Sequence, residues 1–146
     1  MFTNPAVSGL RRAVQECIDC HQACFESAAN FCLEAGGRHV EAEHYRLMLN
    51  CAELCQACAH FMMSSSAFHA PMCSLCAEVC EACADSCEKV GQMQDCVEMC
   101  RRCAATCREM SGSGEIAAPA PTVEARHNRS RSRDQASSAQ SHGRPT

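Results

Sequence analysis

The spacing of 16 cysteines is the feature of this sequence with the clearest chemical meaning. Within four groups they recur every three or four residues, which places side chains along one face of a helix. Thiolates are soft ligands that select Cu(I), Zn(II) or iron–sulfur clusters. The predicted metal ligands are therefore Cys17, Cys20, Cys24, Cys32, Cys51, Cys55, Cys58, Cys73, Cys76, Cys80, Cys83, Cys87, Cys96, Cys100, Cys103 and Cys107.

The same spacing favours metal ions over disulfides as bridges between these sulfurs. Helical neighbours three or four residues apart hold their Cβ atoms about 5–6 Å apart, whereas a disulfide needs about 3.5–4.5 Å. A metal ion bound through bonds of about 2.3 Å spans about twice that distance between two sulfurs. We therefore expect reduced thiols that share metal ions.

Charge favours Cu(I) among the soft metals. A water-poor interior cannot hold a large unpaired charge. About one monovalent ion per thiolate would neutralise the core, whereas Zn(II) in a site of four thiolates leaves two negative charges. We predict uptake of multiple Cu(I) ions, with zinc or cadmium storage in metallothionein-like clusters as the alternative.

Methionine and histidine residues extend the groups of cysteines toward both ends of the predicted core. Antiparallel packing would bring Met62 and Met110 to one end, together with His69 or Met72. Each methionine alone is equally well explained as a flexible side chain that fills a gap. We expect surface positions for His21, His39 and His60. The further predicted ligands are His44, Met48, Met62, Met93 and Met110.

Glycine, proline and serine residues divide the chain into the elements that must position these side chains. We predict helices over residues 5–35, 38–63, 71–90 and 92–110. Asn4 is the expected cap of the first helix, and Pro71 the expected first residue of the third. Short connections favour antiparallel neighbours. The predicted fold is all-α, an antiparallel up-down-up-down four-helix bundle with a cysteine-lined core.

Composition separates a bundle domain, residues 1–110, from a Ser/Arg/Pro-rich tail, residues 111–146, which we expect to be disordered. The first part carries eight basic and 14 acidic side chains, which argues against nucleic acid as a partner. No stretch approaches the roughly 20 apolar residues of a membrane span, and no signal peptide is visible. We therefore expect a cytoplasmic protein without membrane association, whose thiols stay reduced.

Four cysteine motifs in this sequence resemble those of the cytosolic, four-helix-bundle copper storage proteins, over about residues 10–110. The resemblance implies a homotetramer of bundles, each binding many Cu(I) ions through core thiolates, with entry at an end that carries His or Met. The motifs are Cys17-Ile-Asp-Cys20-x-x-x-Cys24, Cys51-Ala-Glu-Leu-Cys55-Gln-Ala-Cys58, Cys76-Ala-Glu-Val-Cys80-Glu-Ala-Cys83 and Cys100-x-x-Cys103-x-x-x-Cys107.

Two departures from the family pattern bear on copper capacity and on the entry route. Ser27 stands where the cysteine spacing of the family would continue. The loop before Cys96 reads Val-Gly-Gln-Met-Gln in place of the histidine-rich form of some cytosolic members.

The predicted function is Cu(I) storage and buffering by a binding protein, not an enzyme. A thiol oxidoreductase is less consistent with the sequence, because reactive Cys-x-x-Cys pairs work at exposed helix starts and most pairs here are in mid-helix. Iron–sulfur clusters are usually held by loops that bend around them, not by straight helices. We also expect the metal-free protein to fold, because cysteine packs as a small apolar residue.

Overall fold

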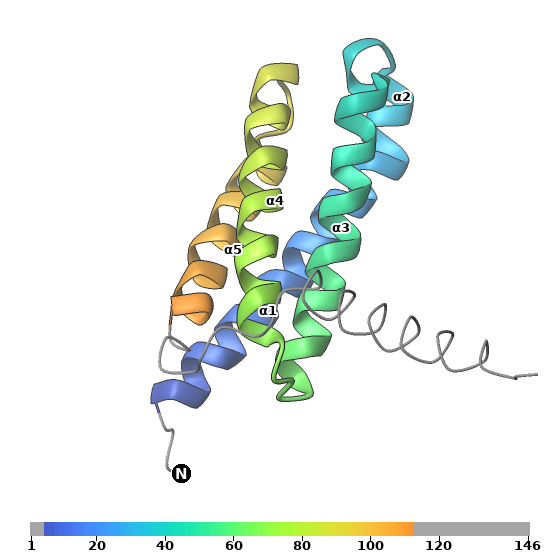
Figure 1. The fold of residues 1–146 in the computed structure, drawn as a ribbon. Coiled ribbons are helices and arrows are strands. Elements are labelled where there is room, and N and C mark those ends of the chain that lie inside the picture. The colour runs from blue at the N-terminus through green and yellow to red at the C-terminus, as the bar shows by residue number, and fades with distance from the viewer. Residues whose placement is uncertain (1–4, 113–146) are drawn as a thin grey trace, which may run out of the picture. The chain divides into compact units, whose positions relative to one another are not determined.

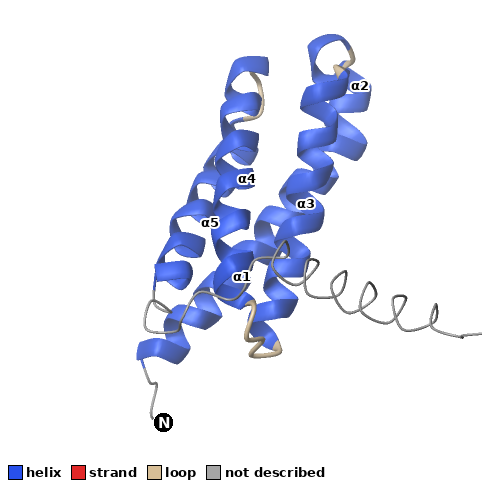
Figure 2. Ribbon diagram, viewed as in Figure 1, coloured by secondary structure: helices blue, strands red, loops and turns tan. Residues whose placement is uncertain are grey.

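The computed structural model describes residues 5–112, in which every regular element is helical (Figures 1 and 2). Helix α1 continues without a break into the π-helix η1 and the short α2. A 3-10 helix, η2, then leads into α3, and two further long helices follow. The bounds are α1 Pro5–Glu26, η1 Ser27–Cys32, α2 Leu33–Ala35, η2 Gly37–Val40, α3 Ala42–Met63, α4 His69–Val90 and α5 Gln94–Gly112.

The four long helices form an antiparallel bundle, as the sequence predicts. Helix α1 packs against α3 and α5, and α4 packs against the same two helices, so the four close a ring around one axis. Figure 1 shows α4 and α5 side by side and α1 crossing near the lower ends of the others. None of the described helices is long and apolar enough to cross a membrane.

The helix boundaries differ from the predicted ones by a few residues. Helix α4 begins at His69, so Pro71 is its third residue and not its first; a proline is tolerated there because the first turn leaves its N–H groups unpaired. Helix α3 begins at Ala42, after the 3-10 turn, and α5 continues to Gly112. The predicted cap Asn4 and the predicted tail from residue 113 onward lie outside the described residues.

The π-helix η1 explains the irregular position of Cys32. A π-helix closes its hydrogen bonds over five residues where an α-helix uses four, so the residues after it are rotated about the axis. Regular continuation from Cys24 would place Ser27 and Phe31 on the core face. Instead Ala28 and Cys32 are buried, whereas Phe31 is 39% exposed.

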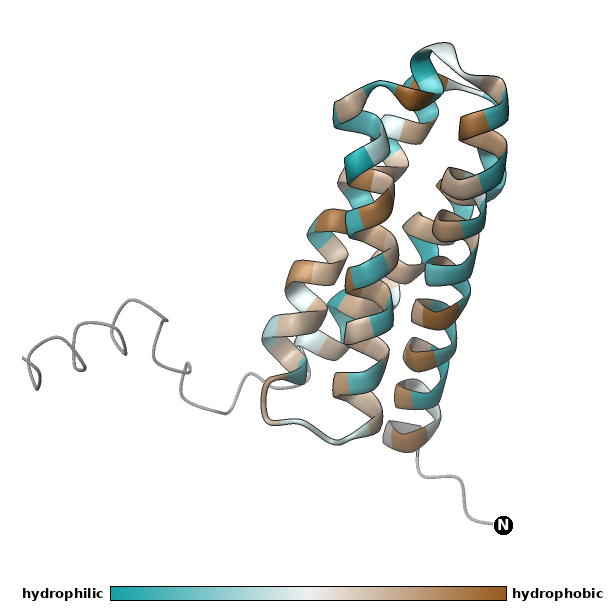
Figure 3. Ribbon diagram, turned by 90° about the vertical axis from the view of Figure 1, so that its right-hand side faces the viewer, coloured by the Kyte–Doolittle hydropathy of each residue, from teal (hydrophilic) through white to brown (hydrophobic). Residues whose placement is uncertain are grey.

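The interior of the bundle is built from small side chains. Figure 3 shows hydrophilic and hydrophobic residues sharing every long helix, as expected for helices with one buried face. Buried alanines let neighbouring helices approach closely, so that short cysteine side chains can meet at the axis. These alanines are Ala13, Ala28, Ala52, Ala59, Ala77, Ala84 and Ala104.

Candidate metal centre

All 16 cysteines point into the bundle as free thiols. None exposes more than 2% of its surface. Helices α1, α3, α4 and α5 each contribute several of them, because cysteines three and four residues apart share one helix face. The structure therefore brings together every cysteine that the sequence predicts to be a metal ligand.

Sulfur atoms from different helices lie 3.5–4.0 Å apart along the axis. That distance far exceeds a disulfide bond of about 2.05 Å, but two metal–sulfur bonds of about 2.3 Å can span it. Twelve cysteines fall into overlapping sets in which all sulfurs lie within 4.8 Å of one another. We call these twelve the thiol section; the sets are Cys17/Cys76/Cys103/Cys107, Cys20/Cys24/Cys51/Cys100, Cys20/Cys55/Cys80/Cys103 and Cys58/Cys73/Cys107.

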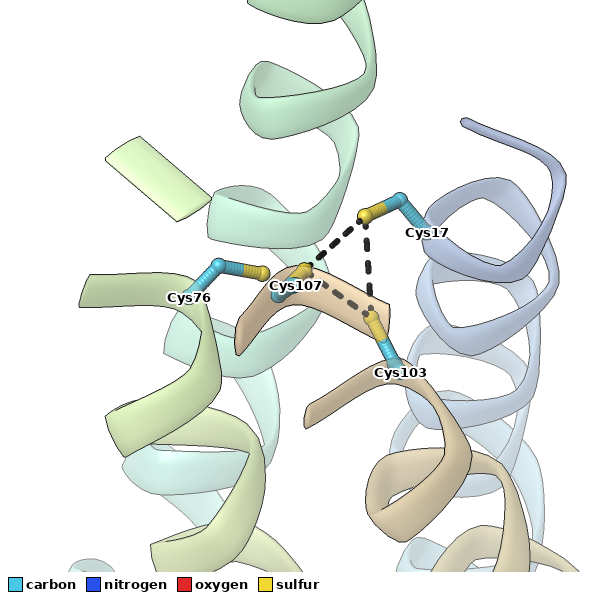
Figure 4. Close-up of side chains that lie close together, drawn as sticks. All are labelled: Cys17, Cys76, Cys103 and Cys107. Carbon is cyan, nitrogen blue, oxygen red and sulfur yellow. Dashed lines mark hydrogen bonds between the residues drawn. The ribbon is translucent and has the colours of Figure 1, made fainter. Parts of the chain in front are cut away.

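One set shows how three helices build a site (Figure 4). Cys17 comes from α1, Cys76 from α4, and Cys103 and Cys107 from successive turns of α5. The Cys17 sulfur lies 3.6 Å from the sulfurs of both Cys103 and Cys107. Because Cys103 and Cys107 also belong to other sets, a metal ion here would share ligands with its neighbours along the channel.

Hydrogen bonds between thiols shift their pKa values in opposite directions. The pKa of Cys103 is lowered to about 7, first by its hydrogen bond with Cys107. The pKa of Cys55 lies far above its usual range, chiefly because its thiol hydrogen-bonds to Cys103. Burial is the largest cause of the raised pKa of Cys32. A partly ionised network of this kind can bind a first metal ion and release further protons as more ions enter.

The remaining four cysteines lie with thioethers and an imidazole at the end of the channel that contains η2. Met48 Sδ accepts hydrogen bonds from the thiols of Cys83 at 3.5 Å and Cys87 at 3.3 Å. Met93 Sδ accepts one from Cys32 at 3.9 Å. We call this end the mixed section; it consists of Cys32, Cys83, Cys87, Cys96, His44, Met48 and Met93.

His44 is the buried imidazole of the mixed section. Its side chain lies one helical turn before Met48, and the residue is 4% exposed. Its Nδ1 lies 2.7 Å from Ser86 Oγ, whereas Nε2 is buried and has no hydrogen-bond partner among the described residues. Burial is also the main reason that its pKa is lowered. A neutral imidazole with a free nitrogen is a common metal ligand.

The opposite end of the bundle has an open pocket lined by soft donors. Met62, His69 and Met110 line it together with Leu10 and the loop between α3 and α4, around a volume of about 450 Å³. This confirms the predicted grouping of Met62 with Met110 and His69 at one end. Met72 is not among the residues that line the pocket.

Comparison with known proteins agrees with this geometry. The family model for copper storage proteins matches residues 6–112. The chain belongs to the copper storage protein family. No curated protein sequence shows significant similarity to it.

Solved structures share the fold, and several of them are of copper storage proteins. A protein from Nitrosospira multiformis is 50% identical with a TM-score of 0.71, over 72% of this chain and 96% of that one. The apo form of copper storage protein 3 from Bacillus subtilis is 35% identical with a TM-score of 0.63, over 69% and 97%. A cytosolic copper storage protein from Streptomyces lividans, solved during copper loading with five coppers, is 28% identical with a TM-score of 0.61, over 72% and 93%.

Within this copper storage protein, Ser27 occupies a position beside the mixed section. Its hydroxyl lies 3.0 Å from the Cys96 sulfur and accepts the thiol hydrogen. From the sequence, Ser27 is notable only because it stands where the cysteine spacing of the family would continue. The hydrogen bond to Cys96 becomes visible only when η1 and the start of α5 are seen side by side.

The surface position predicted for His39 is wrong. His39 is buried at 9% exposure, and its Nε2 donates to the Gly91 carbonyl at 3.1 Å. Its ring also packs edge-on against Phe31, with 5.2 Å between ring centroids. The cause is η2, which folds His39 back over the end of the bundle, and no periodic pattern in the sequence indicates such a turn.

The other two histidines expected at the surface have different outcomes. His60 is exposed, as predicted. His21 is half-buried, because its Nδ1 donates to the Ala52 carbonyl of α3 at 2.7 Å.

Proposed function

We propose that this protein stores Cu(I) by binding many ions along the cysteine channel, and so buffers copper and limits its toxicity. The observation that carries the proposal is the overlap of the sulfur sets in the thiol section, each within 4.8 Å and wholly buried. Shared sulfurs suit a continuous row of monovalent ions, since each thiolate can bridge two ions while the total charge stays near zero.

We further propose that all 16 cysteines are ligands, supplemented at the ends by His44, Met48, Met62, Met93 and Met110. Their positions support this. His44, Met48 and Met93 lie in the mixed section, and Met62 and Met110 line the pocket at the opposite end of the bundle. Thioether sulfur is a soft ligand for Cu(I). The division between a bundle of residues 1–110 and a separate tail of residues 111–146 also remains a prediction.

Zinc or cadmium storage is the competing function, because a set of four cysteines could also hold one tetrahedral divalent ion. Anaerobic titration of the reduced metal-free protein, against a competing Cu(I) chelator and separately against a zinc chelator, distinguishes the two. We expect tight uptake of Cu(I) well beyond the roughly four divalent ions that 16 thiolates could hold as separate sites. Saturation near four Zn(II) ions with weak Cu(I) binding would contradict the proposal.

A binding role without catalysis fits the burial of the thiols. A reactive thiolate in an oxidoreductase must reach its substrate, whereas every cysteine here is at most 2% exposed. We propose that the protein is not an enzyme. Assaying the reduced protein for reduction of disulfides would test this, and turnover above that of a buffer control would contradict it.

The family resemblance supports two further proposals. We propose that four bundles assemble into a homotetramer, which light scattering coupled to size-exclusion chromatography would test. We also propose a cytoplasmic location, which the name of the Streptomyces lividans relative supports. Fractionation of cells followed by detection of the protein would test it.

A further inference from the structure

One buried nitrogen of the mixed section stands out because it has no partner. Among residues 5–112, Nε2 of His44 is the one buried side-chain nitrogen or oxygen without a hydrogen bond. The residue is 4% exposed, so bulk water has little access to this atom. An unpaired buried polar atom is unfavourable, and in a native protein it commonly marks the place of an ion or a ligand.

Soft metal ligands surround the side chain of His44. The residue lies on α3, one helical turn before Met48, and the Met48 Sδ is in contact with the thiols of Cys83 and Cys87. The pKa of His44 is lowered chiefly by burial, and the charge of Cys83 acts in the opposite direction, which indicates that this thiol is near the ring. A Cu(I) ion bound among these donors would give Nε2 its partner.

The hydroxyl group of Ser86 holds the other nitrogen of the ring. Its Oγ lies 2.7 Å from His44 Nδ1. Ser86 directly precedes Cys87 on α4 and follows Cys83 by three residues, so one helix carries both the two thiols and the group that fixes the ring. Metal-binding histidines typically donate their second N–H to an oxygen acceptor, which sets the tautomer and the orientation of the imidazole.

The direction of this hydrogen bond decides whether His44 can bind a metal ion. A hydroxyl group can either donate to Nδ1 or accept from it. If Ser86 donated, Nε2 would carry a hydrogen, could not bind a metal ion and would be a buried N–H without an acceptor. If Ser86 accepts, Nδ1 carries the hydrogen and the lone pair of Nε2 is free for a metal ion. Only the second assignment explains why an unpaired nitrogen is kept in the core.

His44 differs in this respect from other imidazoles of the protein. The hydrogen bonds of His21, His39 and His69 go to backbone carbonyl oxygens. A carbonyl can only accept, so it fixes the tautomer by itself and no substitution removes it. The ring of His44 depends instead on one side-chain hydroxyl, which a single substitution can delete.

We propose that Ser86 is a positioning residue for copper: its hydroxyl accepts the Nδ1 hydrogen of His44 and so keeps Nε2 free to bind Cu(I) in the mixed section. The proposal rests on the Cu(I) storage function and on a ligand role for His44. It adds a residue without a soft donor atom, which cysteine spacing cannot identify. Binding is a ligand exchange: the metal stays Cu(I), a chelator leaves, Nε2 supplies its lone pair, and each thiol that binds releases its proton.

The first test is the retention of the most readily removed Cu(I) ions by the full-length reduced protein. The loaded protein is titrated anaerobically to equilibrium with bathocuproine disulfonate, whose Cu(I) complex is measured by absorbance. We expect Ser86→Ala to weaken retention of these ions about tenfold. His44→Gln should weaken it too, and adding Ser86→Ala to that variant should cause no further loss, because Ser86 acts through His44.

Ser74→Ala is the matched control. Ser74 lies on the same helix, but it is exposed and outside the mixed section, so its substitution should leave copper retention unchanged. Because alanine is the best helix former, circular dichroism should show that Ser74→Ala and Ser86→Ala are as helical as the unmodified protein.

The second test observes the tautomer of His44 in the metal-free protein. Long-range proton–nitrogen NMR of protein with isotope-labelled histidine distinguishes a protonated ring nitrogen from a bare one, and the spectrum of His44→Gln identifies the signals of His44. We expect hydrogen on Nδ1 and a bare Nε2 in the unmodified protein, and a gain of the Nε2–H tautomer in Ser86→Ala. A purely structural role of Ser86 would not change the tautomer.

Three results would overturn the proposal: a hydrogen on Nε2 in the unmodified protein, copper retention unchanged by Ser86→Ala, or an equal loss from Ser86→Ala with and without His44. Retention unchanged by His44→Gln would overturn it as well, while leaving storage by the thiols intact. Failure of the unmodified protein to take up several Cu(I) ions would instead reject the storage function itself, so the two failures are distinguishable.

Discussion

The thiol section and the mixed section lie in one channel, yet they offer different ligands. In the thiol section, cysteines repeat regularly on all four long helices, and 12 sulfurs form sets within 4.8 Å. In the mixed section the repeat breaks: Met48 precedes the cysteines of α3, and Cys32 reaches the core only through η1. Regular spacing therefore gives uniform thiolate sites, and interruption of the spacing gives sites of mixed donors.

The largest difference should appear when one cysteine is removed from each section. Cys103 belongs to two sulfur sets, so Cys103→Ser should lower Cu(I) capacity by about two ions, whereas Cys32→Ser should lower it by about one or less. Anaerobic titration with copper analysis of the desalted protein measures both. Equal losses in the two variants would mean that the sections do not differ in ligand sharing.

Adding a thiol to the mixed section should make it resemble the thiol section. Ser27→Cys places a second sulfur beside Cys96, where the serine oxygen now lies 3.0 Å away. We expect a gain of about one Cu(I) ion. Ser27→Ala is the control and should not raise Cu(I) capacity. If Ser27→Cys also left the capacity unchanged, the geometry of the mixed section, and not its donor atoms, would limit how many ions it binds.

Removing a thioether should weaken the retention of copper more than it lowers capacity. Met48→Leu deletes the sulfur that contacts Cys83 and Cys87 but nearly conserves volume. We expect the most readily removed Cu(I) ions to be held about tenfold less tightly, with saturating uptake lowered by at most about one ion. Competition with a strong Cu(I) chelator measures this, and identical removal curves would contradict a ligand role for Met48.

The smallest effect concerns the metal-free protein at high pH. Burial raises the pKa of Cys32 in the folded state. The contribution of this thiol to the free energy of unfolding is therefore fully present at pH values below the ordinary thiol pKa. Above about pH 9 the unfolded chain loses that proton first, and the free energy of unfolding falls. Urea unfolding of metal-free Cys32→Ala should show a slightly weaker decline with pH than the unmodified protein. A steeper decline would reverse the expected sign.

Most of the fold and the thiol section could be predicted from the sequence, since both depend on helical periodicity. Cysteines at intervals of three and four residues identify the buried face of each helix, and short connections fix the antiparallel order. The structure confirms this for all four long helices.

What the sequence did not reveal depends on contacts between distant segments. The burial of His39 follows from η2 and a hydrogen bond to Gly91, 52 residues away along the chain. The contact between Ser27 and Cys96 joins residues 69 positions apart. The sequence shows that Cys32 departs from the regular cysteine spacing, but it does not predict that a π-helix brings this residue to the core.

The π-helix also determines which side chain of this segment faces the axis. If η1 relaxed to an ordinary α-helix of the same length, the segment would still be fully helical. Each residue turns an α-helix by about 100°, more than a residue turns the wider π-helix, so the relaxed segment would rotate Cys32 away from the axis. Helicity measured by circular dichroism would look intact in such a protein, although a donor had left the copper path.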